Sequence, residues 1–325
     1  MLPKFKNSTT YTADQIMMTL SAIAYANPGD IPAYLANPKY ATMGEWNLVW
    51  GPGVTTGNLM YVVKYKYDNI YAVVIRGTVV SFSFATLVDL YEDLDVGTQM
   101  PWRYPQVPGA FVAGGTLYGL SELASMLSNG MTLFEFLASL PDRAFVFATG
   151  HSLGGCLTTV LAPWLQFRLS AINPSLIMLP ITFAAPTAGN DVFANWYTTK
   201  AFEGRSSRLY NQIDIIPMLW ANLPNMQNLF PPPGPSCPSY MKDIISVVND
   251  WLVDVDKVSY SQPNGNGNPL PGSATKVTDW FLEASMQHDH NYYLKLLNAP
   301  PVSISGMAPA RYIKRRRLMS GLAVS

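Results

Sequence analysis

The segment from Ala144 to Phe167 constrains the fold of this chain more than any other. It contains no charged residue if His151 is neutral, and it consists of an apolar run, AFVFAT, a turn, GHSLGG, and a long apolar stretch. An uncharged segment of this length resembles a membrane span. The glycines of the turn and Pro163 favour instead a buried strand, a sharp turn and a buried helix.

The turn itself predicts a chemically active serine. Gly150-His151-Ser152-Leu153-Gly154 fits the Gly-x-Ser-x-Gly pattern, in which glycines permit a tight turn that exposes a strained serine. The pattern occurs by chance in many chains, but here a strand precedes it and an apolar helix follows, as the motif requires. We therefore predict that Ser152 is a nucleophile; the alternative is a glycine-rich turn without chemistry.

A serine hydroxyl needs a histidine base that a carboxylate orients. The chain has three histidines. His151 directly precedes the serine and cannot easily turn its ring onto its own neighbour. The base is therefore expected to be His288 or His290, which follow the serine in the order known from such enzymes.

Asp214 is the predicted orienting acid. It follows the apolar run RLYNQI and precedes IIP, and functional groups of α/β sheets lie at the ends of such strands. A simple strand-end cap is the alternative for Asp214. The other aspartates between serine and base fall in predicted helices or polar loops and are expected to be surface acids: Asp191, Asp243, Asp250, Asp254, Asp256 and Asp279.

A reacting carbonyl also needs two donors for its developing negative charge. The backbone N–H of Leu153, directly after the nucleophile, is one candidate. Thr78 is the other, because Gly77 and Thr78 directly follow the apolar run NIYAVVIR. The alternative for Thr78 is a residue that only terminates a strand.

The rest of the chain alternates strands with helices, which predicts a mainly parallel sheet flanked by helices in a single α/β domain over residues 1–325. Thr12 and Gln15 suggest a capping box for a helix that runs to Ala26. The expected elements are a hairpin over 60–67 and 69–76, helices over 110–140, 153–169 and 192–199, and strands over 144–149, 175–184 and 207–213.

A Pro/Gly-rich insertion is expected over about 222–273. Prolines in NLFPPPGPSCPSY exclude a regular element over 222–240, because they remove donors and fix φ. A second breaker-rich stretch covers 261–273. Between them, residues 241–255 show a helical pattern.

Composition narrows the class of partner. Lys plus Arg and Asp plus Glu are 21 each, so no overall field favours nucleic acid. The two cysteines have neither disulfide nor metal spacing, and we expect no metal and no transmembrane segment. The N-terminus lacks the apolar core of a signal peptide; the cytoplasm is the default expectation, and secretion without such a signal also fits.

Taken together, these residues resemble the fungal-type, or class 3, lipase family. The matching segments follow the family order over roughly two thirds of the chain. They are IRGT at 75–78, GHSLGG at 150–155, FAAPTAGNDVFANWY at 183–197, NQIDIIP at 211–217 and HNYY at 290–293.

The resemblance implies an α/β-hydrolase fold that needs no cofactor, with Ser152 as nucleophile, Asp214 as acid and His290 as base. His290 is favoured over His288 because HNYY resembles the family's His-x-x-Tyr. Thr78 and Leu153 would hold the oxyanion. The family also implies a lid, here about residues 79–96, with four apolar residues facing the acyl groove: Phe82, Phe84, Leu87 and Val88.

The expected activity is hydrolysis of carboxylic esters, with acylglycerols at a lipid–water interface as the leading substrates. A phospholipase or a feruloyl-type esterase would use the same scaffold, and a non-catalytic binding protein is a further alternative. The insertion has no recognisable counterpart in the family. The tail over about 308–325 contains Lys314 and Arg315 to Arg317 and is expected to be solvated, with contact to a membrane surface or partner as the alternative.

Overall fold

The computed structural model describes most of the chain. The predicted oxyanion residue Thr78, the lid residues Phe82, Phe84, Leu87 and Val88, and the basic tail lie outside the described residues. The described residues are 3, 5, 10–55, 57–77, 94–264 and 267–304.

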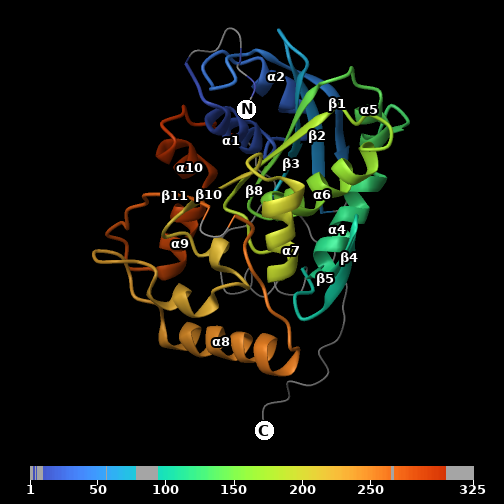
Figure 1. Ribbon diagram of the computed structural model, residues 1–325. Coiled ribbons are helices and arrows are strands. Elements are labelled where there is room, and N and C mark those ends of the chain that lie inside the picture. Colours follow the sequence, from blue (N-terminus) through green and yellow to red (C-terminus); the bar gives the residue numbers. More distant parts are fainter. Residues whose placement is uncertain are drawn as a thin grey trace.

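A single large sheet organises the described part of the chain (Figure 1). Its strands follow the order β1-β2-β3-β8-β9-β10-β11. The first three pair antiparallel, and β3, β8, β9, β10 and β11 run parallel. The bounds are β1 (Trp46–Val54), β2 (Leu59–Tyr65), β3 (Ile70–Ile75), β8 (Phe145–His151), β9 (Ile177–Phe183), β10 (Ser207–Asn211) and β11 (Asn268–Leu270).

Helices flank this sheet, and two small antiparallel pairs lie outside it. The helices are α1 (Ala13–Ile23), α2 (Ile31–Leu35), α4 (Gly114–Ser125), α5 (Leu133–Ala138), α6 (Leu153–Leu169), α7 (Asp191–Trp196), α8 (Ser239–Asp250), α9 (Trp280–His288) and α10 (His290–Leu296). The pairs are β4 (Gln99–Arg103) with β5 (Gln106–Ala113) and β6 (Leu127–Ser128) with β7 (Met131–Thr132).

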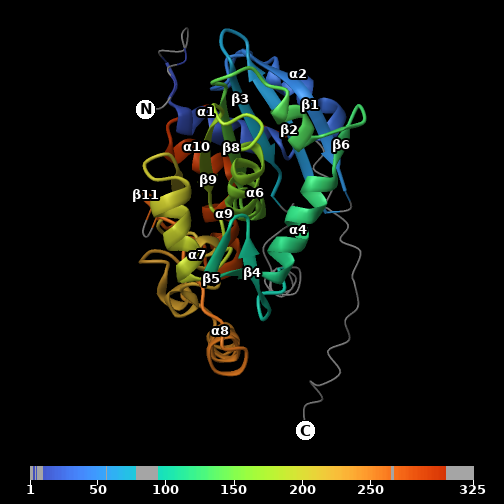
Figure 2. The same cartoon turned by 45° about the vertical axis from the view of Figure 1, so that its right-hand side comes forward.

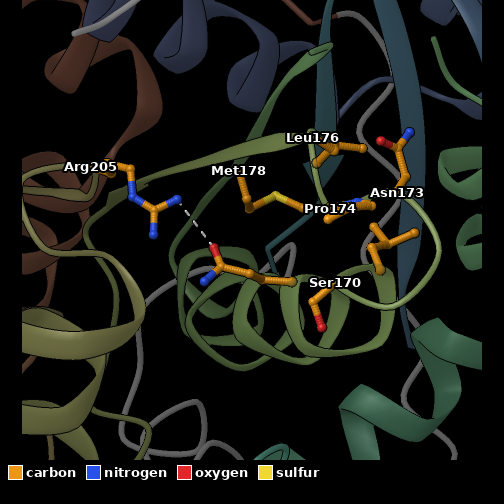
Figure 3. A pocket seen from close by; sticks show the side chains of 8 residues that line it. Ser170, Asn173, Pro174, Leu176, Met178 and Arg205 are labelled. Atoms are coloured by element: carbon orange, nitrogen blue, oxygen red, sulfur yellow. Dashed lines mark hydrogen bonds between the residues drawn. The ribbon is translucent and has the colours of Figure 1, made fainter. Parts of the chain in front are cut away.

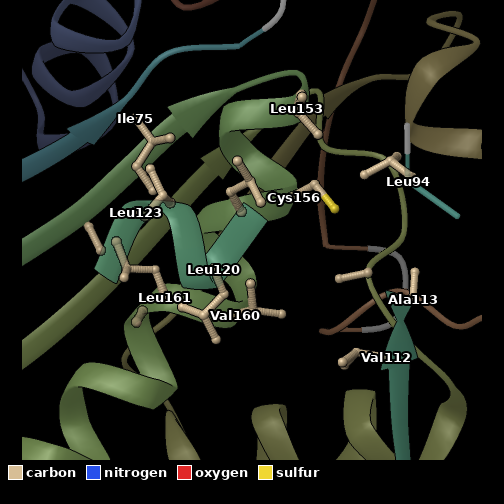
Figure 4. Packing of buried hydrophobic residues seen from close by; sticks show 14 of the residues in the cluster. Ile75, Leu94, Val112, Ala113, Leu120, Leu123, Leu153, Cys156, Val160 and Leu161 are labelled. Atoms are coloured by element: carbon tan, nitrogen blue, oxygen red, sulfur yellow. The ribbon is translucent and has the colours of Figure 1, made fainter. Parts of the chain in front are cut away.

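Each face of the sheet has its own apolar core, because successive strand residues point to opposite faces. In β8, Val146 and Ala148 join the core beneath α4 and α6, whereas Phe147 joins the core beneath α1 and α10. Figure 4 shows the first core, where Leu120 and Leu123 of α4 meet the apolar side of α6. The turn that carries Ser152, between β8 and α6, therefore lies between two packed layers.

Several predicted elements are confirmed. Thr12 and Gln15 form the reciprocal capping box that begins α1, and β2 pairs with β3 as the predicted hairpin. The turn is preceded by β8 and followed by α6, as its apolar pattern indicated. The mainly parallel sheet with flanking helices is the α/β-hydrolase architecture.

Other predicted elements are corrected. Residues 110–113, predicted as helix, complete strand β5; a short segment of mixed apolar residues does not separate the two conformations by periodicity. Residues 223–228 form a 3-10 helix inside the proline-rich stretch. The breaker-rich stretch contains β11, in which Pro269 is tolerated because β11 is an edge strand.

The segment predicted as an insertion supplies this edge strand and the helix α8, which begins two residues before the predicted helical pattern. In both views α8 lies at the opposite end of the molecule from α2 (Figure 1; Figure 2). This segment therefore contributes one strand to the main sheet and one helix at its periphery.

Candidate active site

The turn between β8 and α6 holds Ser152 in a strained backbone conformation. Its φ is 60° and its ψ is −131°, a combination that non-glycine residues rarely adopt and that marks functional turns. A Cβ on Gly154 would overlap the backbone carbonyl of Ile75 in the neighbouring strand. Glycine at this position is what allows α6 to begin against β3 and to present the serine.

Three side chains form one hydrogen-bonded line at the carboxyl ends of the parallel strands. Ser152 Oγ lies 2.8 Å from His288 Nε2, and His288 Nδ1 lies 2.7 Å from Asp214 Oδ2. All three side chains are buried. Because an ionised carboxylate only accepts, His288 donates through Nδ1 and its Nε2 is left to accept the serine proton.

Three donors surround the carboxylate of Asp214. The backbone N–H of Ile216 donates to Oδ1 at 2.9 Å, while His288 and the hydroxyl of Tyr293 both donate to Oδ2, the hydroxyl at 2.8 Å. The three bonds fix the carboxyl group directly behind the imidazole, where it can orient the ring.

The expectation that His290 would stand beside the serine is corrected by this geometry. His290 begins helix α10, its ring stacks on Tyr25 with centroids 5.2 Å apart, and its Nε2 faces the amide of Asn291 at 3.3 Å. Burial lowers the pKa of His290, and the neighbouring Asp289 acts in the opposite sense. The alternative predicted base, His288, occupies the position between serine and acid.

The prediction was wrong because one helix ends and another begins between the two histidines. α9 ends at His288, and Asp289 then caps α10 by accepting from the backbone N–H groups of Asn291 and Tyr292. His288 thereby contacts Ser152 and Asp214, whereas His290 packs on Tyr25. The His-x-x-Tyr pattern correctly singles out Tyr293, but as a partner of Asp214 rather than as a marker for His290.

His151, beside the serine, is also part of the site. Its Nδ1 lies 2.8 Å from the hydroxyl of Tyr25, and its ring centroid lies 4.7 Å from that of His288. Burial, followed by the proximity of His288 and His290, lowers the pKa of His151 well below its usual value. A neutral His151 spares the base a second positive charge at close range. Sequence reasoning did not find Tyr25, which follows α1 and has no motif of its own.

The two predicted oxyanion donors differ in how far the structure describes them. Leu153 is the first residue of α6, where a backbone N–H has no carbonyl partner within the helix. Gly77 lies against Ser152, since a Cβ there would meet the Ser152 Cβ at 3.1 Å and overlap the carbonyl of His151. Thr78 follows Gly77 directly but is outside the described residues.

Two cavities in the described part of the chain lie away from this line of residues. One, of about 230 Å³, lies among Ser170, Met178 and Arg205, where Arg205 Nη1 donates to Gln166 Oε1 at 3.4 Å (Figure 3). The other, of about 370 Å³, is lined by Trp220, Leu252, Val253 and residues 257–260, among others. Neither contains Ser152, Asp214 or His288. A search of the described residues finds no group of side chains suited to a metal ion.

The sheet, the turn between β8 and α6 and the line of serine, histidine and aspartate define an α/β-hydrolase. Residues 72–223 match the family model described as Lipase (class 3). Over these residues the chain is similar to the class 3 lipases, and it is an ester-hydrolysing enzyme.

One of the solved structures similar to this chain shares its fold. The crystal structure of M37 lipase superposes with a TM-score of 0.79 at 25% identity, over 89% of this chain and 93% of that chain. A Rhizomucor miehei lipase propeptide complex gives 0.45 at 23% identity, over 63% and 61% of the two chains. The lipase from Rhizopus microsporus var. chinensis gives 0.46 at 22% identity, over 64% and 70%.

Two further searches gave negative results. No curated protein sequence matches the chain significantly. Within the described residues, no helix combines the length and the apolar character that crossing a bilayer requires.

Proposed function

We propose that the chain hydrolyses carboxylic esters through a covalent acyl-enzyme, with Ser152 as nucleophile, His288 as base and Asp214 as orienting acid. The observation that supports this proposal is the hydrogen-bonded line from Ser152 Oγ through His288 to Asp214. A serine of ordinary reactivity requires this arrangement at neutral pH.

In the first step His288 Nε2 takes the proton of Ser152 while Oγ attacks the ester carbonyl. The tetrahedral intermediate collapses as the carbon–alkoxide bond breaks, and His288 gives its proton to the leaving alcohol. Water then attacks the acyl-enzyme, again losing a proton to His288. The second collapse returns that proton to Ser152 and releases the carboxylic acid.

The oxyanion of each intermediate is stabilised by the backbone N–H of Leu153 and by Thr78. Support for Leu153 comes from its place as the first residue of α6, where a backbone N–H has no carbonyl partner within the helix and the helix dipole favours negative charge. Support for Thr78 comes from its neighbour Gly77, which packs against Ser152. Removal of one such donor typically costs ~10²–10³ in kcat.

Acylglycerols at a lipid–water interface are the substrates we propose, with residues 79–96 as the lid. The match of residues 72–223 to the class 3 lipase model and the similarity to M37 lipase support this choice. A phospholipase or a feruloyl-type esterase remains the second candidate, because the fold does not determine the substrate. The intact line of three residues disfavours a non-catalytic binding protein.

The test is ester hydrolysis by the wild type, Ser152→Ala, His288→Ala and His290→Ala, each checked for folding by circular dichroism. We expect the first two variants to lose about 10³-fold or more in kcat. His290→Ala is the matched control and should keep activity within about tenfold, because its ring stacks on Tyr25 away from Ser152. Full activity in folded Ser152→Ala would refute the proposed mechanism.

The substrate is tested with the same wild-type protein on short- and long-chain p-nitrophenyl esters, emulsified trioleoylglycerol, phosphatidylcholine and methyl ferulate. We expect the highest rates on long acyl chains and on the emulsion. Preference for phosphatidylcholine or for methyl ferulate would leave the mechanism intact and replace the acylglycerol assignment.

A further inference from the structure

A chain of buried polar side chains leads from helix α9 to the candidate active site. Its members are Glu283, Gln287, Asn211, Tyr293 and Asp214, and each has an exposed fraction of 0%. Gln287 directly precedes His288, and Asn211 ends the strand that leads to Asp214. The network therefore connects the two segments that hold the base and the acid, without passing through the base itself.

Glu283 joins α9 to the segment that follows β11. Its Oε1 accepts from the backbone N–H of Thr275 at 3.0 Å and from Gln287 Nε2 at 2.8 Å, and its Oε2 accepts from the Thr275 hydroxyl. Gln287 Nε2 also donates to the carbonyl of Ser273 at 2.9 Å. The Glu283 carboxylate thus links helix α9 to the segment around Thr275.

Gln287 and Asn211 join α9 to β10. Asn211 Nδ2 donates to Gln287 Oε1 at 2.7 Å and to the Gln287 carbonyl at 3.0 Å. The backbone N–H of Asn211 donates to the Tyr293 hydroxyl at 2.9 Å, and that hydroxyl donates to Asp214. A Cβ on Gly272 would overlap Asn211 Oδ1, so the loop closes tightly over this contact.

A buried carboxylate is costly to stability, and an apolar residue of similar volume would often stabilise a core as well or better. What a fully bonded polar network supplies is one fixed geometry. Fixed geometry matters most beside His288, because a displacement of about 1 Å in a reacting group can cost ~10²-fold in rate. The network is buried, fully bonded and next to His288, so it can fix the position of that side chain.

We propose that Glu283 is a positioning residue for the reaction. Acting through Gln287 and Asn211, it holds the last turn of α9 on β10 so that His288 meets both Ser152 and Asp214. This inference rests on the proposed function of those three residues. It adds a residue that contacts neither the substrate nor the reacting atoms.

The experiment compares Glu283→Ala with Glu283→Gln in the full-length chain. Glu283→Ala removes the acceptors for Thr275 and Gln287, and we expect kcat for p-nitrophenyl ester hydrolysis to fall by about 10- to 100-fold with KM within about twofold. Glu283→Gln keeps one acceptor oxygen, and its amide can donate to the Thr275 hydroxyl. We expect it to restore kcat to within about threefold of the wild type.

The split between kcat and KM separates positioning from general loss of stability. A displaced His288 slows the chemical step while the substrate binds as before, so kcat should fall at nearly unchanged KM, and Glu283→Gln should restore it. Asn173→Ala is the control, since it removes a buried hydrogen bond to the Leu140 carbonyl remote from the site and should leave kcat and KM unchanged.

Wild-type kcat in folded Glu283→Ala would overturn the inference, as would equal loss in Glu283→Gln or in Asn173→Ala. If Glu283→Ala does not fold, Gln287→Met decides the question, because it removes the side-chain bonds of Gln287 to Glu283, Asn211 and Ser273 with little change in volume. The expected loss of kcat in Gln287→Met supports the inference, and wild-type kcat refutes it. Absence of ester hydrolysis in the wild type would instead refute the proposed function.

Discussion

Tyr293 is the residue whose contribution is easiest to isolate. Its hydroxyl shares Oδ2 of Asp214 with His288, so Tyr293→Phe removes one donor and leaves the ring in place. We expect kcat to fall by about 3- to 30-fold, because a hydrogen bond to a charged group contributes ~1.5–3 kcal/mol and part of it is replaced by relaxation. Kinetics at saturating p-nitrophenyl ester measure the effect.

Tyr292→Phe is the matched control for this change. Its hydroxyl binds the backbone of Ser273 at the surface and does not contact Asp214. Equal losses of kcat in the two variants would argue against a specific role for the bond from Tyr293 to Asp214.

Cys156 is the second residue with a definite chemical expectation. It lies in α6 with an exposed fraction of 0%, and burial raises the pKa of its thiol to about 12. Since thiolates are the reactive species, native protein should not be labelled at Cys156 by a maleimide at pH 7. Mass spectrometry of peptides from native and urea-unfolded protein checks this; fast labelling of Cys156 in native protein would contradict its burial.

At the scale of single elements, the capping box of α1 predicts a measurable contribution to stability. Thr12→Ala removes the acceptor for the backbone N–H of Gln15, which should cost about 1 kcal/mol of unfolding free energy. The position is far from Ser152 in the fold, so kcat should not change. Urea unfolding measures the loss. Thr10→Ala is the control, because Thr10 lies near the helix but takes no part in the cap. Identical unfolding midpoints for both variants would show that the cap contributes nothing.

Elements with a strong local pattern could be predicted from the sequence. β8 and α6 are buried along nearly their whole length, and the glycine turn between them admits little else. β11 could not be predicted, because Asn268–Leu270 has no strand pattern of its own. It is a strand only because β10 offers an unpaired edge, which is information that local sequence does not contain.

The candidate site divides in the same way. Ser152 was predicted from a motif and Asp214 from the end of a strand, and both lie in the hydrogen-bonded line. The choice between His288 and His290 depends on where one helix ends and the next begins, and element boundaries are what periodicity defines least well. Tyr25 and Glu283 act through contacts between distant segments and left no local signal.

For the whole molecule, two buried histidines predict loss of stability in mild acid. Burial holds the pKa values of His151 and His290 below the ordinary value of about 6.5. The unfolded chain therefore binds more protons than the native one once the pH falls below about 6.5. The stability that these groups contribute is complete above that pH and declines below it toward their native pKa values.

Urea unfolding at pH 7.5 and pH 5.5 tests the direction of this pH dependence. We expect a lower unfolding free energy at pH 5.5, and a smaller difference between the two pH values in His290→Gln, which removes one of the two groups. A protein equally stable at both values, or more stable at pH 5.5, would contradict the burial of neutral histidines.

The junction between α9 and α10 also bears on how the enzyme is made. Ser152 and Asp214 are synthesised well before His288, and the chain emerges from the ribosome with its N-terminal part first. A nascent chain can fold its nucleophile turn and still lack its base. The proposed triad is complete only when α9 docks, so the nascent enzyme holds no competent acyl-transfer centre until translation has passed His288.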